Sequence, residues 1–455
     1  MKRKWLVVGI ILFFIGTCII PAIAQDTEKP LPTSRGSWLY VGGSGPGNYT
    51  RIQDAIDNTS DGDTVFVFNG TYYENVIINK AINLIGENRN TTIIDGNESG
   101  NVIKLVANGI EVTGFTIQNC TNTWNYAGIK ILSNYNTVSH NIILTNTSDW
   151  DIISDGIDII GKNHNSIIGN TIFNNWVGIY LEDASHNNIA ENIIFETLHG
   201  VYAYGYSNNN TIIGNNISNI GNNNIYLDEN SNDCVISNNY LNTGTEAILI
   251  YYCNNIKIIG NEICNADSGM QLTGNYFTIS NNIIYNGGYS GITTEYGYYS
   301  TIINNTIINF RVGIDYEDST NGNISYNRVS KCDNGMQIIS PGKSNLIFKN
   351  EFRDNHIGLF TELKYGTVKI TYNNFINNSK PITFQQTFPI RRQTPKNPIF
   401  DKNYYDDWRG VGPKVLMGLT LIFVFPPIPF WGIPIYIRCL YCDWHPAQEP
   451  YDIGG

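Results

Sequence analysis

The hydrophobic and polar positions of the chain repeat with a period of 23 residues. Thirteen asparagines from Asn97 to Asn373 follow this period, because the twelve intervals between them span 276 residues. Eight residues after Asn170 stands Gly178, and small residues, usually glycines, follow the other asparagines in the same way. The next position is always apolar, and the position two further along is mostly apolar. This alternation is typical of a strand that is buried on one face.

A repeat of this length is too short for a helical hairpin and predicts a solenoid of strands. We expect an all-β fold, a right-handed single-stranded parallel β-helix of about 13 coils with a rise of about 4.8 Å per coil. The repeats would cover residues 97–388. Residues 25–96 would form an N-terminal cap and the first coils, and residues 389–455 an irregular C-terminal cap.

The repeated asparagine has a structural explanation. Where one strand bends into the next, side-chain amides stacked along the helix axis can bond backbone groups that the bend leaves unpaired. We therefore predict a ladder of amides that crosses the coils. Five consecutive members of the predicted ladder are Asn170, Asn192, Asn215, Asn238 and Asn261.

The first 24 residues have the pattern of a secretory signal peptide. The basic segment 2–4 precedes an apolar run from Trp5 to Ile20, and Ala22-Ile23-Ala24 matches a cleavage site. We therefore expect an exported protein that is extracellular or at the cell surface, or periplasmic if the host has an outer membrane.

Two further segments would close the ends of the β-helix. Residues 50–53 have the pattern of a capping box ahead of a short amphipathic helix, which we expect to cover the first coil. The tail has no charged residue from Val415 to Ile437, a length that could cross a bilayer, although four prolines interrupt it. We interpret the tail as a cap over the last coil, and a membrane anchor is the alternative. Any membrane contact would be made through this tail alone.

The charge excludes one class of partner. The chain has a net charge of −11, and only 15% of its residues are charged. Nucleic-acid binding requires clusters of Lys and Arg, which the sequence lacks, so we expect no nucleic-acid partner. We expect a monomer.

Outward positions on the strands after the glycine column are the candidate binding site. Two residues past that column stand Tyr180, Tyr202 and Tyr226, and four residues past it stand Glu182, Tyr204, Asp228 and Tyr251. Aromatic rings beside carboxylates suit pyranose rings, which have an apolar face and hydroxyl groups. The pattern predicts a carbohydrate-binding face that contacts a polysaccharide or a cell-surface glycan. The alternative is that tyrosine is simply favourable on an exposed strand.

One coil is longer than the others, since 29 residues separate Asn141 from Asn170. The insertion places four carboxylates close together in the sequence: Asp149, Asp151, Asp155 and Asp158. Oxygen ligands of this kind bind calcium, so calcium is the one candidate cofactor of a chain that otherwise requires none. The alternative is a solvated acidic loop.

Motifs in the N-terminal segment resemble a known family. Residues 52–56 (IQDAI), 62–65 (GDTV) and 70–72 (GTY) are similar to the opening of NosD-like and pectin-lyase-like β-helix proteins, whose carbohydrate-binding and sugar-hydrolase repeats the Asn and Gly columns also resemble. The resemblance covers residues 37–388. It implies a fold shared by lyases, hydrolases, non-catalytic binders and NosD, an accessory of copper-enzyme maturation. The six histidines are scattered, so the residues themselves give little support for copper.

A resemblance to polygalacturonases supplies catalytic candidates. The segment 154–158 is similar to a catalytic strand of that family, and residues 198–200 to its Gly-His-Gly motif, which implies Asp155, Asp158 and His199 as catalytic residues. The coil between them reads Asn175-Trp176-Val177-Gly178 where the family has a pair of aspartates. Carboxylates that such a glycosidase needs are therefore missing.

Together these patterns predict an exported β-helix protein that binds polysaccharide or glycan without catalysis. A polysaccharide lyase or glycoside hydrolase of the same fold is the first alternative. A structural surface spacer, or a copper-enzyme accessory protein like NosD, is the second.

Overall fold

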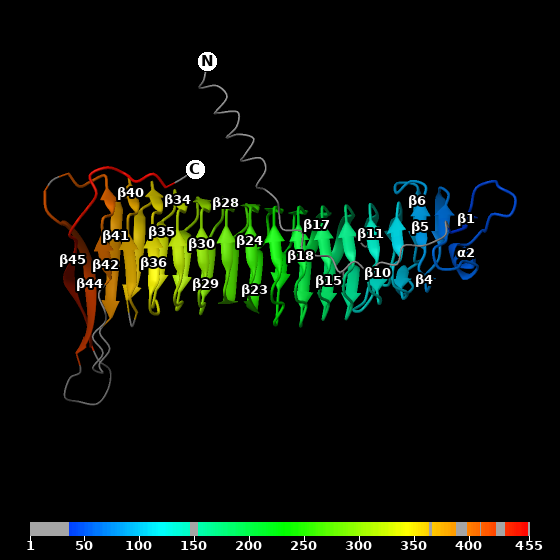
Figure 1. Ribbon diagram of the computed structural model, residues 1–455, viewed down its shortest axis with the longest axis horizontal. Helices are drawn as coiled ribbons and strands as arrows, with labels where there is room; N and C mark the ends of the chain where they lie inside the picture. Colours follow the sequence, from blue (N-terminus) through cyan, green and yellow to red (C-terminus); the bar gives the residue numbers. More distant parts are fainter. Residues whose placement is uncertain are drawn as a thin grey trace, which may run out of the picture. The chain divides into compact units, whose positions relative to one another are not determined.

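The computed structural model describes residues 36–145, 153–363, 366–387, 398–409, 411–424 and 433–453 (Figure 1). All of them belong to one compact unit, Gly36–Gly455, which is distinct from Met1–Arg35. The expected signal peptide lies outside the described residues, as do Asp149 and Asp151 of the long coil.

The described residues form a right-handed parallel β-helix with two sheets, which confirms the expected all-β fold. The first sheet has 16 strands, from β1 (Trp38–Val41) to β42 (Ile399–Asp401). In the second sheet neighbouring coils also pair in parallel, for example β15 (Thr171–Glu182) with β17 (Ile193–Tyr204). The β-helix has about 15 turns rather than the expected 13, because coils also form before Asn97 and after Asn373.

The core is a stack of equivalent apolar positions. In the second sheet Ile157, Ile179, Val201 and Ile225 are in register on consecutive coils, and all four are fully buried. Because neighbouring strands lie about 4.8 Å apart, each aliphatic side chain packs on its equivalents in the coils before and after it. The apolar column of the sequence is therefore the core of the β-helix.

The glycine that precedes each of these apolar residues is explained by close backbone approach. A Cβ atom on Gly178 would lie 2.6 Å from Ile194 Cγ2 and 2.7 Å from the carbonyl oxygen of Gly200. Both distances are well below van der Waals contact. A larger residue at this position would therefore push neighbouring coils apart.

Buried asparagines form a ladder that crosses the coils. In one step the Asn192 backbone N–H and Nδ2 both donate to Asn215 Oδ1, at 3.0 Å each, and Nδ2 also donates to the Ile167 carbonyl oxygen at 2.8 Å. Each amide thereby joins the coil before it to the coil after it. Within the described coils the ladder passes through Asn141, Asn170, Asn192, Asn215, Asn239, Asn261, Asn282, Asn305, Asn327, Asn350, Asn373, Asn403 and Asp443.

The predicted ladder is wrong at Asn238, because the ladder residue is Asn239. Asn238 is exposed and has a φ of 53°, so it takes the left-handed position of the bend just before the ladder. The period cannot distinguish two adjacent asparagines, since repeat lengths vary by more than one residue. A second ladder, which the sequence analysis misses, passes through Asn136, Asn165, Asn187 and Asn210.

At the N-terminal end the expected helical cap is not shown. The helix α2 (Ile52–Asp57) has six residues, and β1 precedes it and pairs with β2 (Thr64–Val67), so the first sheet begins before the helix. The expected capping box is also absent from this helix. The Glu74 carboxylate instead accepts the backbone N–H groups of Ile52 and Gln53, at 2.8 and 3.0 Å.

The described part of the tail is regular, which corrects the expected irregular cap. β44 (Lys414–Val424) continues the second sheet in parallel with β41 (Lys380–Thr387), and β45 (Ile433–Asp443) pairs with β44 as an antiparallel hairpin. The Asp443 carboxylate accepts the Asn403 backbone N–H and Nδ2, both at 3.0 Å, and so ends the asparagine ladder. Over the ranges that the structure describes, no helix is long and apolar enough to span a membrane.

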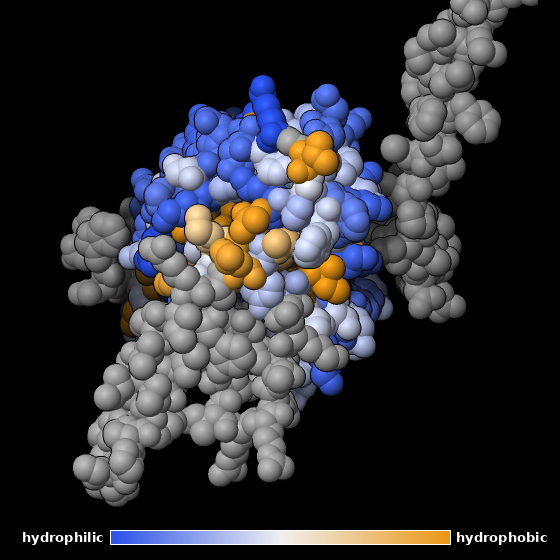
Figure 2. Space-filling view, turned by 90° about the vertical axis from the view of Figure 1, so that its left-hand side faces the viewer, coloured by the Kyte–Doolittle hydropathy of each residue, from blue (hydrophilic) through white to orange (hydrophobic). Residues whose placement is uncertain are grey.

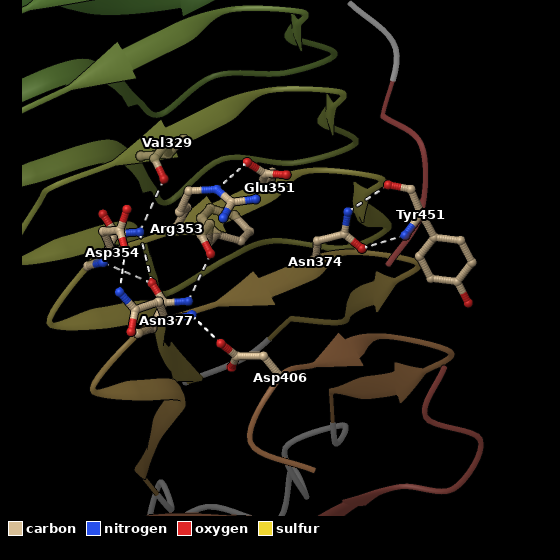
Figure 3. Close-up of polar contacts among 11 residues, drawn as sticks. Val329, Glu351, Arg353, Asp354, Asn374, Asn377, Asp406 and Tyr451 are labelled. Carbon is tan, nitrogen blue, oxygen red and sulfur yellow. Dashed lines mark hydrogen bonds and ion pairs between the residues drawn. The ribbon is translucent and has the colours of Figure 1, made fainter. Parts of the chain in front are cut away.

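The residues after this hairpin contact earlier coils (Figure 3). The Asn374 side chain and the Tyr451 backbone, 77 positions apart in the sequence, exchange two hydrogen bonds of 2.8 Å. Nearby, Asp406 accepts the backbone N–H of Asn377 at 2.5 Å. These contacts attach the tail to the β-helix.

Substitution of a ladder residue should cost far more stability than substitution of its neighbour. Asn239→Ala removes the acceptor of the Asn215 N–H and Nδ2 and leaves buried groups unpaired, so we expect unfolding free energy to fall by about 3 kcal/mol. The control Asn238→Gly, at a positive φ that glycine adopts readily, should change it by less than about 1 kcal/mol. Urea denaturation measures both values, and equal losses would show that the ladder does not stabilise the coils.

Candidate functional site

One outward column of the second sheet brings together several of the predicted site residues. Lys130 of β10 (Ala127–Ile131), Asp158 of β13 (Asp155–Ile160), Tyr180 of β15, Tyr202 of β17 and Tyr226 of β20 (Asn223–Leu227) are in register on consecutive coils. They alternate with the buried aliphatic residues, so their side chains leave the sheet on its outer face. These five residues are named the outer column.

The aromatic part of the outer column is stacked. The Tyr202 and Tyr226 rings are parallel to within 7°, with centroids 4.6 Å apart, and the Tyr180 ring is tilted by 60° at 5.5 Å from Tyr202. The strand spacing of about 4.8 Å imposes this arrangement, because each strand presents its ring at the same register position. The Tyr202 and Tyr226 rings therefore cover each other's faces, whereas the Tyr180 ring is tilted out of this stack.

A carboxylate accepts from two of the three hydroxyls. Asp228 Oδ2 accepts from Tyr226 at 2.9 Å and from Tyr202 at 3.4 Å. Burial raises the pKa of all three tyrosines, and the negative charges of Glu182 at Tyr180 and Asp228 at the other two add to the rise. The phenols are therefore protonated at neutral pH and can donate hydrogen bonds.

The other predicted binding residues are placed differently. Glu182 and Tyr204 are in register with each other beside the outer column. Tyr251 was predicted four residues past the small-residue column, like Asp228 of the preceding coil, and is not part of the outer column, in which Leu249 lies opposite Tyr226. The Tyr251 side chain is exposed.

His199 lies behind the tyrosines. Its ring centroid is 5.6 Å from that of Tyr202 and 6.1 Å from that of Tyr226, and the residue is only 8% exposed. Burial lowers the pKa of His199 to about 4, and a hydrogen bond with Asn223 offsets part of the decrease. The imidazole is therefore neutral at neutral pH and packs under the aromatic rings.

Two aspartates and a lysine form a buried group next to the rings. Lys130 Nζ lies 3.4 Å from Asp158 Oδ2, and Asp155 Oδ1 accepts the Val177 backbone N–H at 3.1 Å. Burial raises the pKa of both carboxyl groups; the neighbouring Asp158 adds to the rise at Asp155, and Lys130 opposes the rise at Asp158. The pair can share one proton, and Lys130 balances the remaining negative charge.

The three catalytic candidates are not assembled into a two-carboxylate glycosidase site. Asp158 is paired with Lys130, and Asp155 accepts a backbone N–H, so neither carboxylate is free as the two catalytic carboxyl groups of a glycosidase are. His199 is two strands away from β13, a separation of about 10 Å along the sheet. The structure brings the two aspartates together and leaves the histidine with the tyrosines.

The calcium hypothesis is untested, because Asp149 and Asp151 lie outside the described residues. Asp158 already has a cationic partner in Lys130. Among the residues whose placement is described, no three His, Cys, Asp or Glu side chains are grouped closely enough to bind a metal.

The sequence analysis did not single out a pocket on the same face. Asp315 of β32 (Val312–Glu317) occupies the outward register position four coils after Tyr226 and lines this pocket with Arg311 and Gln337. Burial raises the pKa of Asp315 to about 7, and the charge of Glu317 adds to the rise. The 23-residue period places Asp315 at an outward position of its strand, but it does not show that the side chain is buried.

Two family models match the coils. One, described as periplasmic copper-binding protein (NosD), matches residues 220–410, and the other, described as right handed beta helix region, matches residues 80–241. The chain is a right-handed β-helix protein whose residues 220–410 are similar to NosD. The predicted resemblance to NosD-like β-helix proteins is thus confirmed for the coils, whereas the motifs at residues 52–72 lie outside the matched ranges. Copper binding is part of the description of one matched family.

No curated protein matches this NosD-like chain. Similar solved structures include the Dettilon tailspike protein, with 14% identity and a TM-score of 0.43 over 73% of this chain and 64% of that one. The catalytic unit of a GH87 alpha-1,3-glucanase from Streptomyces thermodiastaticus has 13% identity and a TM-score of 0.46, over 81% and 70%. The periplasmic alginate epimerase AlgG has 14% identity and a TM-score of 0.38, over 60% and 79%. Similarity at this level gives no information on activity.

The neutral state of His199 predicts a pH dependence of stability. Its pKa is about 4 in the folded protein and about 6.5 in the unfolded chain, so between these values the unfolded chain binds more protons. The free energy of unfolding should therefore fall by about 2 kcal/mol through this residue as the pH drops from about 6.5 to 4. Urea denaturation at several pH values should show a shallower decrease for His199→Gln than for the exposed control His356→Gln. The same slope in both variants would contradict a buried neutral histidine.

Proposed function

We propose that the NosD-like chain is an exported protein that binds a neutral polysaccharide or glycan on its outer column without cleaving it. The observation that supports this function is the row of Tyr180, Tyr202 and Tyr226 on consecutive coils, bordered by Asp228 and Glu182. The row thus contains aromatic rings, which can stack on the apolar face of a pyranose ring, and carboxylates, which can accept hydrogen bonds from its hydroxyls.

The chemistry of the row matches the chemistry of a sugar. The tilted Tyr180 ring can stack on the apolar face of a pyranose ring, and its hydroxyl can donate to a sugar oxygen. The Tyr202 and Tyr226 hydroxyls donate to Asp228, and their oxygens can accept from sugar hydroxyls. The carboxylates of Asp228 and Glu182 can accept from sugar hydroxyls. Since the strands repeat these groups about every 4.8 Å, one extended glycan chain can contact several coils.

The negative charge around the outer column favours neutral glycans over acidic ones. The chain has a net charge of −11, and the outer column is bordered by carboxylates. Polyuronates would be repelled by this field, whereas neutral glycans would not. We therefore assign the neutral class as the ligand.

Export rests on two supports. Residues 1–24 have the pattern of a signal peptide, and the matched family is described as periplasmic. In this proposal the protein acts outside the cytoplasm, where extracellular or periplasmic polysaccharides are accessible.

An enzyme of the lyase or hydrolase class is the second candidate, and the Asp155–Asp158 pair favours it. Burial raises the pKa of both carboxyl groups next to the binding row, which is the direction of shift that a general acid requires. Product analysis on a bound glycan separates this candidate from the first. Cleavage that Asp158→Asn abolishes would establish the enzyme.

Loss of one central ring should weaken glycan binding. Tyr202→Ala removes a ring and a hydroxyl from the middle of the row, so we expect the dissociation constant of a neutral glycan to rise about fivefold to tenfold. A glycan array identifies the ligand, and titration calorimetry then compares variants.

The matched control is Tyr73→Ala on β3 (Gly70–Tyr73), whose side chain is 71% exposed but lies far from the row in the sequence. It should leave the affinity unchanged. Unaltered affinity in the double variant Tyr180→Ala, Tyr202→Ala would rule out the outer column as the binding site.

A further inference from the structure

The outer side of the C-terminal hairpin carries an exposed apolar patch. From Val415 to Leu419 of β44 the residues alternate between exposed and buried, with Val415, Met417 and Leu419 exposed by 50%, 69% and 43%. On β45 Leu440 is 64% exposed and lies directly opposite Met417. Figure 2 shows apolar surface at this end of the molecule. These four residues are named the hairpin patch.

The hairpin patch differs from the rest of the described surface. Every leucine and methionine that is exposed among the described residues belongs to it: Met417, Leu419 and Leu440. Elsewhere on the coils the exposed large apolar residues are tyrosines, tryptophans, isoleucines and valines. Long flexible aliphatic side chains gathered on one sheet face indicate contact with an apolar partner.

The charge pattern around the hairpin patch indicates which partner. No charged residue occurs between Lys414 and Arg438, so 23 consecutive residues are uncharged. The Lys414 ammonium lies 2.6 Å from Asp407 Oδ2, which neutralises the one cation at the base of β44. The segment 425–432 that joins the strands reads FPPIPFWG, and three of its eight residues are aromatic. Uncharged aliphatic and aromatic sequence of this composition suits the boundary of a lipid bilayer.

A second copy of the chain fits this surface less well. Pro434, the second residue of the outer strand β45 and opposite Phe423, has no backbone N–H to pair with a further strand. Two chains of net charge −11 would also repel each other. A bilayer requires neither strand pairing nor charge complementarity.

We propose that the hairpin β44–β45 attaches this protein to a lipid bilayer, with Val415, Met417, Leu419 and Leu440 entering the boundary of the acyl chains. The attachment is peripheral, because the strands are part of the second sheet and stay paired to β41. It would hold the β-helix at a membrane surface. The proposal is independent of glycan binding, since it uses different residues at the end of the coils.

Flotation with vesicles of phosphatidylcholine tests this attachment. The protein used is residues 25–455, which contains the whole compact unit Gly36–Gly455 and lacks the apolar N-terminal run. The chain should float with the vesicles at low and at high salt, because the attraction is apolar. The double variant Met417→Asp, Leu440→Asp should lower the vesicle-bound fraction at least about tenfold.

The matched control is Ile283→Asp on β28 (Ile283–Tyr285), a 50% exposed aliphatic residue on a coil strand. It should float like the unchanged protein. Thermal unfolding checks that the variants are folded, and the milder pair Met417→Ser, Leu440→Ser should show a smaller loss in the same direction.

Two results would overturn the proposal. The first is that the unchanged protein does not float, or that the double variant floats equally well. The second is that analytical ultracentrifugation shows a dimer that the double variant abolishes, while vesicles bind neither protein. In that case the hairpin patch is an interface between copies of the chain.

Discussion

A row of buried side-chain amides holds the coils in register, and the rest of the structure depends on it. At each bend a backbone N–H has no partner in either sheet, and the amide oxygen of the next coil accepts it, as Asn215 Oδ1 accepts from Asn192. A buried amide is costly unless its own donors are also paired, so each asparagine requires another one in the following coil. Asp443 can end the row, because a carboxylate accepts hydrogen bonds but has no donor that needs a further partner.

This register determines what the outer face can do. Because the same position is in phase on every coil, any outward residue lies directly beside its equivalents, as Tyr202 lies beside Tyr226. The core and the ladder constrain inward residues to apolar side chains, Asn and Gly, whereas outward residues are free to vary. The row Lys130, Asp158, Tyr180 shows this freedom, since it changes from a cation to an acid to an aromatic ring over three coils. The outward residues can therefore form a binding surface for an extended ligand while the core and the ladder stay the same.

The fold could be predicted from the sequence because the period, the apolar column and the asparagines report one repeated physical unit. The sequence could not predict which of two adjacent residues takes a given position in the coil. Asn238 and Asn239 are both asparagines, and only the backbone bend shows that Asn239 is the ladder residue. The surroundings of Asp155, Asp158 and Asp315 depend on residues of neighbouring coils. Their burial therefore could not be predicted from the nearby sequence. The hairpin of the tail was missed because its strands follow no repeat.

The central functional claim is that the row of tyrosines is where a glycan binds. The most direct test is a crystal structure of the protein with a neutral oligosaccharide that it binds in solution. The account predicts a pyranose ring against Tyr180 and sugar hydroxyls within hydrogen-bond distance of Asp228 or of the Tyr202 hydroxyl. An oligosaccharide seated on another face, with these side chains still in contact with solvent, would contradict it.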